Sequence, residues 1–128
     1  PVSIATAQRD FGSERIRFAT CDEECIPFAD GTFDVVFTAC VFHHIERSQH
    51  ERWAAELARV TRAGGLTFIF EHNPLNPVTV RAVRACPFDE GVVLLRPGYT
   101  RRLLARTGLV TERPRFYFFF PRPLAALR

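Results

Sequence analysis

Two nearly continuous apolar runs, separated by one amphipathic segment, constrain the fold of this chain more than any other feature. The first run covers residues 33–42 and the second covers residues 66–70. Between them, residues 47–62 place Trp53, Leu57 and Val60 at helical spacing. Strands that are apolar on both faces are typical of parallel sheets covered by helices, and a helix between two such strands makes a crossover. The sequence therefore predicts an α/β fold with a doubly wound, mostly parallel sheet flanked by helices.

The rest of the chain continues this alternation of strands and helices. Further helices are predicted at residues 2–11, 78–85, 97–107 and 121–128, and further strands at residues 16–20 and 116–120. Gly12 is expected to end the first helix, and Gly64 with Gly65 to end the helix at residues 47–62. A chain of 128 residues suffices for one domain, so we interpret residues 1–128 as a single domain.

Composition narrows the choice of partners and compartment. The 17 basic residues are all arginines spread along the chain, whereas a nucleic-acid-binding face shows a denser basic stripe, so no nucleic-acid partner is predicted. The chain lacks both a run of about 18 apolar residues and a basic-then-apolar leader, which predicts a cytoplasmic protein without a transmembrane segment. The four cysteines form no CxxC pair, so we interpret them as reduced thiols and predict no metal. Zinc held by cysteines and histidines is the alternative.

Polar and small residues follow the predicted strands at the points where the strands end. In open parallel sheets, ligands bind beyond the carboxyl ends of the strands. The sequence therefore predicts a site on this rim, with candidates that follow three successive strands: Asp22 and Glu23; Thr38, Ala39, Cys40, His43 and His44; and Glu71, His72 and Asn73.

A series of short motifs accompanies these candidates in a fixed order. The series comprises Asp22, Ile26-Pro27-Phe28, Asp30-Gly31-Thr32-Phe33-Asp34-Val35-Val36, Phe42-His43-His44-Ile45, a helix with Trp53 and Glu56-Leu57, and Arg62-Ala63-Gly64-Gly65. In order, spacing and residue type, residues 16–65 resemble the middle of class I S-adenosylmethionine-dependent methyltransferases of the small-molecule type, types 11 and 12. The resemblance implies a partial Rossmann-like fold and S-adenosylmethionine as cofactor.

The resemblance also implies roles on the cofactor side of the site. Asp22 would accept a hydrogen bond from the adenine amino group, a task that suits a carboxylate because it only accepts. The backbone at Glu23 would contact the edge of the adenine ring. Thr38, Ala39 and Cys40 would lie beneath the methionine part of the cofactor. A capping or solvated acid at residue 22, and simple core packing at residues 38–40, remain open as alternatives.

On the acceptor side, His44 and His43 are the candidates for a general base, because the pKa of histidine lies near neutral pH. Shaping of the pocket is the alternative role for both. Glu71, His72 and Asn73 would face the acceptor or form a hydrogen-bonded rim. The implied activity is methyl transfer to a small molecule, such as a lipid-like molecule or a sugar.

Three expected family elements are missing from the sequence: the glycine-rich turn after the first strand, the acidic residue that ends the second strand, and the final strand. We interpret the chain as an incomplete domain that begins just after the first two elements. Unpaired strand edges are costly when they are buried. The chain alone is therefore expected to bind the cofactor weakly, to be inactive, and to self-associate through its sheet edges.

Two other classes of protein remain as alternatives. A dinucleotide-binding domain of the NAD type would need a G-x-G-x-x-G turn after a strand, and this chain has none. A degenerate, non-catalytic binding module would use the aromatic run at residues 116–120 to hold a partner, because exposed apolar patches mark interaction sites.

Overall fold

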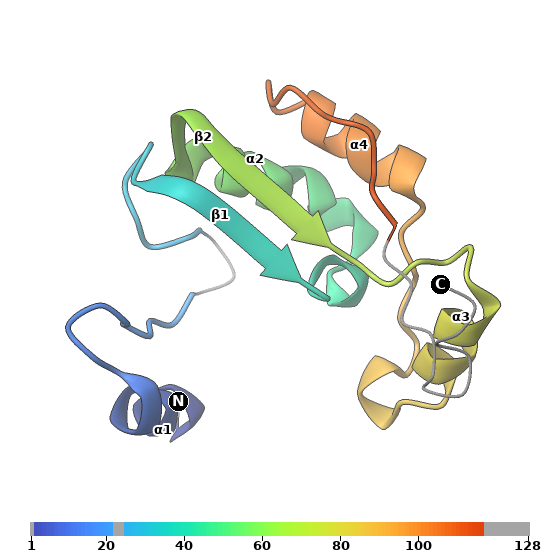
Figure 1. Ribbon diagram of the computed structural model, residues 1–128, viewed down its shortest axis with the longest axis horizontal. Coiled ribbons are helices and arrows are strands. Elements are labelled where there is room, and N and C mark those ends of the chain that lie inside the picture. Colours follow the sequence, from blue (N-terminus) through green and yellow to red (C-terminus); the bar gives the residue numbers. More distant parts are fainter. Residues whose placement is uncertain (1, 22–24, 117–128) are drawn as a thin grey trace, which may run out of the picture.

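The computed structural model describes residues 2–21 and 25–116. Its centre is a parallel pair of strands, β1 (Phe33–Ala39) and β2 (Thr61–Phe70), joined by helix α2 (His50–Val60) (Figure 1). Two short 3₁₀ segments, η1 (Phe42–His44) and η2 (Arg47–Gln49), lie between β1 and α2. This strand–helix–strand unit confirms the predicted α/β class and the parallel crossover, and it is a part of a Rossmann-like sheet.

The two strands run side by side from Val35 and Leu66 to Ala39 and Phe70. Their register is irregular before that point, because Phe33 lies opposite Thr61 while Val35 already lies opposite Leu66. A Cβ on Gly65 would lie 2.9 Å from the carbonyl oxygen of Asp34, so a side chain does not fit there. The prediction that Gly64 and Gly65 end the helix is wrong. The helix ends at Val60, and Gly65 allows the close approach of β2 to β1, while Gly64 has a φ angle of 76°.

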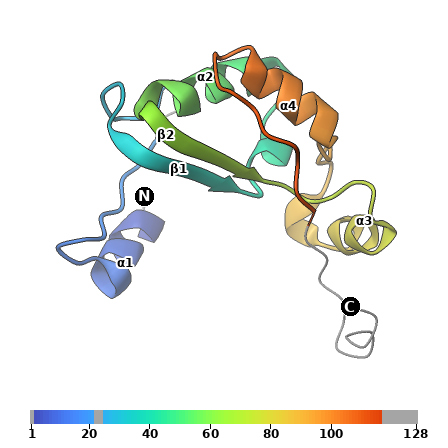
Figure 2. The same cartoon turned by 45° about the horizontal axis from the view of Figure 1, so that its top comes forward.

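One face of the sheet carries the core. Helix α2 packs against both strands and against α4 (Pro97–Ala105), and both helices lie on the same side of the sheet (Figure 2). Buried side chains from this side form one apolar cluster: Phe42, Ala54, Leu57, Leu95 and Leu103. The predicted amphipathic helix therefore buries its apolar stripe as expected, and it fixes the position of the strand ends relative to η1.

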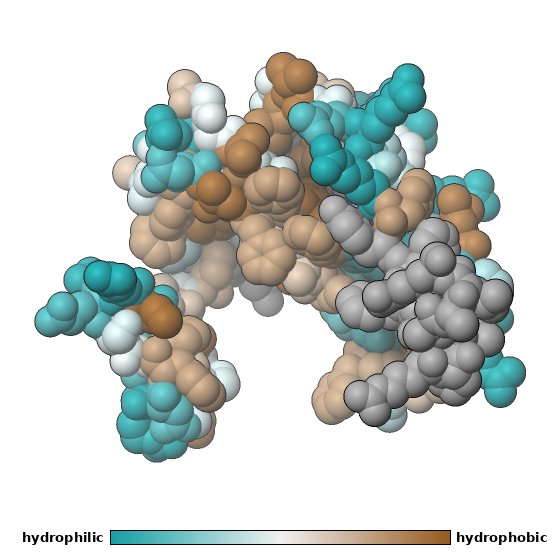
Figure 3. Space-filling model, in the orientation of Figure 1, coloured by the Kyte–Doolittle hydropathy of each residue, from teal (hydrophilic) through white to brown (hydrophobic). Residues whose placement is uncertain are grey.

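The opposite face of the sheet is exposed in the described part of the chain. Apolar side chains gather over β1 and β2 in the centre of Figure 3. The exposed fractions of the outward-facing side chains range from 43 % to 61 %: Val35, Phe37, Leu66, Phe68 and Phe70. The prediction that these strands are buried on both faces is therefore wrong, because α2 and α4 cover the same face.

The remaining elements lie at the two ends of the sheet. Helix α1 (Val2–Phe11) lies apart from the strands in both ribbon views and buries no side chain. Helix α3 (Pro77–Arg84) begins where the Asn76 side chain accepts hydrogen bonds from the amides of Val78 and Thr79. The 3₁₀ segment η3 (Pro87–Asp89) follows α3 and returns the chain towards the strand ends. The predicted helices at residues 2–11, 78–85 and 97–107 are thus confirmed.

Not every predicted element forms. Residues 16–20 are not a strand, because Ile16 bonds locally to Ser13 and no other described segment pairs with this one in a ladder. Phe116 is not in a strand, and residues 117–128, where the rest of a strand and a helix were predicted, lie outside the described residues. Within the described ranges, no helix is long and apolar enough to cross a membrane.

Candidate functional site

The carboxyl ends of β1 and β2 lie next to each other, because Ala39 pairs with Phe70 in the parallel register. The segment after β1 turns through Cys40 into η1, and the segment after β2 continues with Glu71 and His72. The structure therefore brings together the predicted rim residues of these two strands. Asp22 and Glu23, the candidates of the preceding segment, lie outside the described residues.

Cys40 makes the turn out of β1. Its φ angle of 54° is in the left-handed region, which non-glycine residues seldom occupy, and its amide donates to the carbonyl oxygen of Phe70 at 2.9 Å. Partial burial of the thiol, together with the negative charges of Glu71 and Asp89, raises the pKa of Cys40, although the residue as a whole is exposed. A neutral thiol is therefore favoured beside these two carboxylates.

The carboxylate of Glu71 holds the segment after β1 in place. Its Oε1 accepts hydrogen bonds from the amides of Val41 and Phe42 at 3.1 and 2.8 Å. Its Oε2 lies 2.6 Å from Nδ1 of His43. Both oxygens are thus engaged by the neighbouring strand end, which identifies Glu71 as a residue that positions η1.

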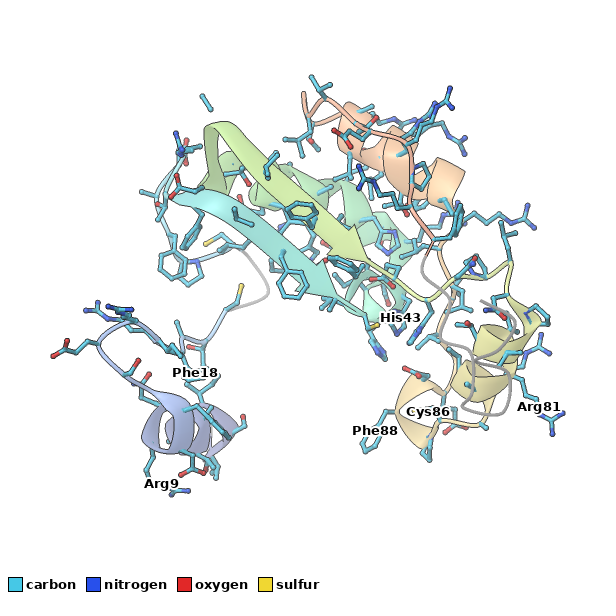
Figure 4. The ribbon with its side chains drawn as sticks, in the orientation of Figure 1. Arg9, Phe18, His43, Arg81, Cys86 and Phe88 are labelled. Atoms are coloured by element: carbon cyan, nitrogen blue, oxygen red, sulfur yellow. The ribbon has the colours of Figure 1, made fainter. Side chains whose placement is uncertain are left out.

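His43 is the centre of the polar cluster. Its side chain is 0 % exposed, and its two ring nitrogens face two different carboxylates. Nδ1 faces Glu71, and Nε2 lies 3.4 Å from Oδ1 of Asp89 in η3. In Figure 4, His43 lies between the strand ends and the segment that carries Cys86 and Phe88. A residue from a third segment therefore completes the cluster.

Two further histidines border this centre. The Nε2 atom of His44 lies 3.3 Å from the same Oδ1 of Asp89, and the side chain of His44 is 43 % exposed. The ring of His72 lies 5.0 Å from the ring of His43, centroid to centroid. One ligand atom each from His43, His72 and Asp89 lie within 4.8 Å of one another.

Asp89 is the residue that the sequence analysis missed. A hydrogen bond from the Cys86 thiol, followed by the contact with His43, holds the pKa of Asp89 below its ordinary value. The acid therefore remains ionised beside the histidines. The sequence offers no spacing signal for it, because it lies 46 positions after His43 and reaches the rim only through the path of α3 and η3.

The other candidates differ in their surroundings. Oγ1 of Thr38 is buried and has no hydrogen-bond partner within residues 2–21 and 25–116, and Ala39 is exposed at the end of β1. Asn73 is half-buried, and its Oδ1 accepts from the amide of Leu75 at 3.0 Å, so its amide oxygen stabilises the turn before α3. The described contact of Asn73 is thus with the turn before α3 rather than with His43.

The comparison with known protein families identifies the class of the chain. Residues 1–69 match the family described as "Methyltransferase domain", a match that includes α1, β1, α2 and nearly all of β2. The chain therefore belongs to this family, that is, to the class I S-adenosylmethionine-dependent methyltransferases of type 11. No curated protein matches the chain. The match does not favour either a dinucleotide-binding domain or a non-catalytic module.

Members of this family use S-adenosylmethionine. The end of β1 offers the partnerless hydroxyl of Thr38 and the small residue Ala39, followed by the left-handed turn at Cys40. A buried hydroxyl without a partner is costly, and a ligand atom at this position would satisfy it.

Proposed function

We propose that this chain takes part in S-adenosylmethionine-dependent methyl transfer to a small-molecule acceptor. The observation that carries the proposal is the family match, which includes β1 and the residues that end it. The polar cluster at the same rim supports it, because ligands of parallel α/β sheets bind at the carboxyl ends of strands. The cofactor supplies an electrophilic methyl group on a sulfonium ion, so the protein has mainly to position the acceptor and remove its proton.

Thr38, Ala39 and Cys40 are proposed to lie beneath the methionine part of the cofactor. Asp22 is proposed to accept from the adenine amino group, and the backbone of Glu23 to contact the ring edge. Thr38 has the strongest support, because its buried Oγ1 has no hydrogen-bond partner among the described residues.

His44 is proposed as the general base in preference to His43. Both ring nitrogens of His43 face carboxylates, and its side chain is fully buried, so an acceptor cannot reach it. His44 is 43 % exposed and contacts Asp89 through Nε2 alone. Its Nδ1 can then accept a proton, while Asp89 orients the ring and stabilises its positive form.

Glu71 and His72 are proposed to form the wall of the acceptor side. Glu71 is a positioning residue, because its oxygens are occupied by the amides after β1 and by His43. His72 is half-buried beside His43 and is the member of this pair that an acceptor could touch. Asn73 is proposed to contribute only through the turn that its side chain stabilises.

Ligand-observed NMR with S-adenosylhomocysteine tests the proposal, because saturation transfer detects weak complexes. We expect transfer from the protein to the adenine protons, little transfer to NAD, and an affinity weaker than low micromolar. Asp22→Asn should reduce the adenine signal, and Glu14→Gln, a change at an exposed acid, should leave it unchanged. An absence of transfer to S-adenosylhomocysteine from the wild-type chain would contradict the proposed function.

A further inference from the structure

A cluster of metal-ligand side chains lies at the strand ends and comes from three separate segments. His43 belongs to η1, His72 follows β2, and Asp89 ends η3. Their ligand atoms lie within 4.8 Å of one another, and Figure 4 places His43 between the strand ends and the η3 segment. The fold therefore brings two imidazoles and one carboxylate close together.

The position of the hydrogen on the His43 ring leaves two acceptor atoms facing each other at the centre of this cluster. The 2.6 Å contact with Glu71 uses the Nδ1 atom of His43 as the donor, because a carboxylate can only accept. In the neutral ring, Nε2 then carries a lone pair, and this lone pair faces Oδ1 of Asp89 at 3.4 Å. Two acceptors face each other stably only when a cation lies between them. That cation is either a proton or a metal ion.

The distances favour the metal ion over the proton. A charge-assisted N–H···O contact is about 2.7–2.9 Å long, whereas the contact between Nε2 of His43 and Oδ1 of Asp89 is 3.4 Å. In a tetrahedral site with bonds of about 2.0–2.1 Å, neighbouring ligand atoms lie roughly 3.3 Å apart. The spacing between His43 and Asp89 is thus that of two ligands in one coordination shell, and His72 lies within 4.8 Å of both, so a shift of its side chain would complete the set.

The charge balance points in the same direction. The side chains of Glu71 and Asp89 are 9 % and 12 % exposed, and both carboxylates face His43. In the part of the chain that the structure describes, no arginine forms an ion pair with either of them. Charges with so little access to water are costly unless they are paired. A divalent cation at Nε2 of His43 would neutralise both acids at once.

We propose that His43, His72 and Asp89 bind one divalent first-row transition-metal ion, with Zn²⁺ as the representative. Imidazole ligands suit Zn²⁺ and its neighbours, whereas Mg²⁺ and Ca²⁺ prefer oxygen ligands alone. Glu71 holds Nδ1 of His43, which is the carboxylate–histidine arrangement that orients a metal-binding imidazole. Three protein ligands leave the fourth position open, as in catalytic zinc sites.

The metal site would also have a role in catalysis, and this role rests on the proposed methyl transfer. A metal ion with an open position can bind an oxygen, nitrogen or sulfur atom of an acceptor and promote loss of its proton. The metal site itself stands independently of methyl transfer. Its presence can be measured without S-adenosylmethionine, so a failure of either idea is distinguishable from a failure of the other.

The experiment is a titration of the metal-free chain with Zn²⁺ by calorimetry and with Co²⁺ by visible absorption. We expect one Zn²⁺ per chain, no competition from Mg²⁺, and Co²⁺ absorption bands of the intensity of a four-coordinate site. Asp89→Ala and His72→Ala should weaken Zn²⁺ binding by at least about 10-fold, and Glu71→Gln by about 10–100-fold. Glu90→Ala is the matched control, because it removes an exposed acid beside Asp89 and should leave the affinity unchanged.

Three results would overturn the proposal. The first is no stoichiometric Zn²⁺ binding by the wild-type chain, which would leave a proton between His43 and Asp89. The second is equal affinity of the wild-type chain and the Asp89→Ala variant. The third is a thiolate-to-Co²⁺ charge-transfer band that persists in Asp89→Ala, because the metal would then be bound by cysteines. Far-UV circular dichroism of each variant shows that the fold is retained, and Glu71→Gln keeps an oxygen for the amides of Val41 and Phe42.

Discussion

Replacement of Arg59 by alanine should release the segment at residues 26–30 from helix α2. The guanidinium donates to the carbonyl oxygens of Ile26 and Phe28 at 2.9 and 2.8 Å and to Asp30 at 2.8 Å. It also forms two hydrogen bonds with Glu56, at 2.7 and 2.8 Å, and Glu56 in turn accepts from the amide of Ile26. Arg59 therefore makes most of the side-chain hydrogen bonds that attach this segment to α2, and Glu56 adds one more.

The size of the stability loss in Arg59→Ala follows from the exposure of each partner of Arg59. Hydrogen bonds to a charged group contribute about 1.5–3 kcal/mol each where water is excluded. The side chains of Arg59 and Glu56 are 29 % and 15 % exposed, so only part of that value applies. Asp30 is 82 % exposed, and its ion pair contributes at most about 1 kcal/mol. Since the released carbonyl groups regain water, we expect Arg59→Ala to cost about 2–3 kcal/mol in the free energy of unfolding.

Thermal and urea unfolding followed by circular dichroism measure this loss. For a domain of this size, each kcal/mol lowers Tm by roughly 4 °C, so Arg59→Ala should lower Tm by about 8–12 °C. Arg52→Ala is the matched control on the same helix, because Arg52 makes one 3.4 Å hydrogen bond to Gln49 and is expected to cost under about 0.5 kcal/mol. Equal losses in the two variants would refute the reasoning.

Three further predictions follow from particular contacts. The hydrogen bond from Arg59 lowers the pKa of Glu56 from 4.5 to about 2, so the wild-type chain should lose stability as pH falls from 4.5 towards 2. Urea titrations at several pH values should show a shallower loss for Glu56→Gln. Identical slopes for the two proteins would contradict this prediction. Nε2 of His50 lies 2.9 and 3.0 Å from two carbonyl oxygens, so Nε2 carries the ring hydrogen and Nδ1 accepts from the Tyr99 hydroxyl. Tyr99→Phe leaves Nδ1 without this donor and should cost about 1–3 kcal/mol in the free energy of unfolding, measured with urea. A loss under about 0.5 kcal/mol would rule this out. We propose that the exposed sheet face and strand edges cause the chain to self-associate. Analytical ultracentrifugation should detect the association, and Phe37→Glu should reduce it. A wild-type chain that stays monomeric at high concentration would contradict the proposal.

The sequence was sufficient to predict the parts of the fold whose pattern is local and strongly periodic. The strand at β1, the helix at α2 and the second half of β2 all follow from apolar periodicity. Residues 16–20 alternate in the same way but form no strand, because a strand needs a hydrogen-bonding partner beside it and alternation does not supply one. The exposed face of β1 has a similar cause, since burial depends on where α2 and α4 pack.

The candidate site was likewise predictable only where its residues belong to a local pattern. His43 and Glu71 each follow a strand, so the parallel register alone brings them together. Asp89 follows no strand, and its contact with His43 depends on the path of α3 and η3, which no local pattern encodes. The absence of a metal stays a prediction, and it rested on the lack of a CxxC pair in the sequence. Ligands that converge from three segments leave no such spacing.

The two proposals for this rim share one atom and therefore constrain each other. Oδ1 of Asp89 lies 3.4 Å from Nε2 of His43 and 3.3 Å from Nε2 of His44. A metal ion bound between His43 and Asp89 would withdraw charge from this oxygen, and Asp89 would then stabilise a protonated His44 less well. If the metal is present, proton removal from the acceptor should thus depend on the ion, and His44→Ala should affect methyl transfer little. If the metal is absent, His44 carries that role, and His44→Ala and Asp89→Asn should both lower methyl transfer in a longer protein that contains this chain and is active.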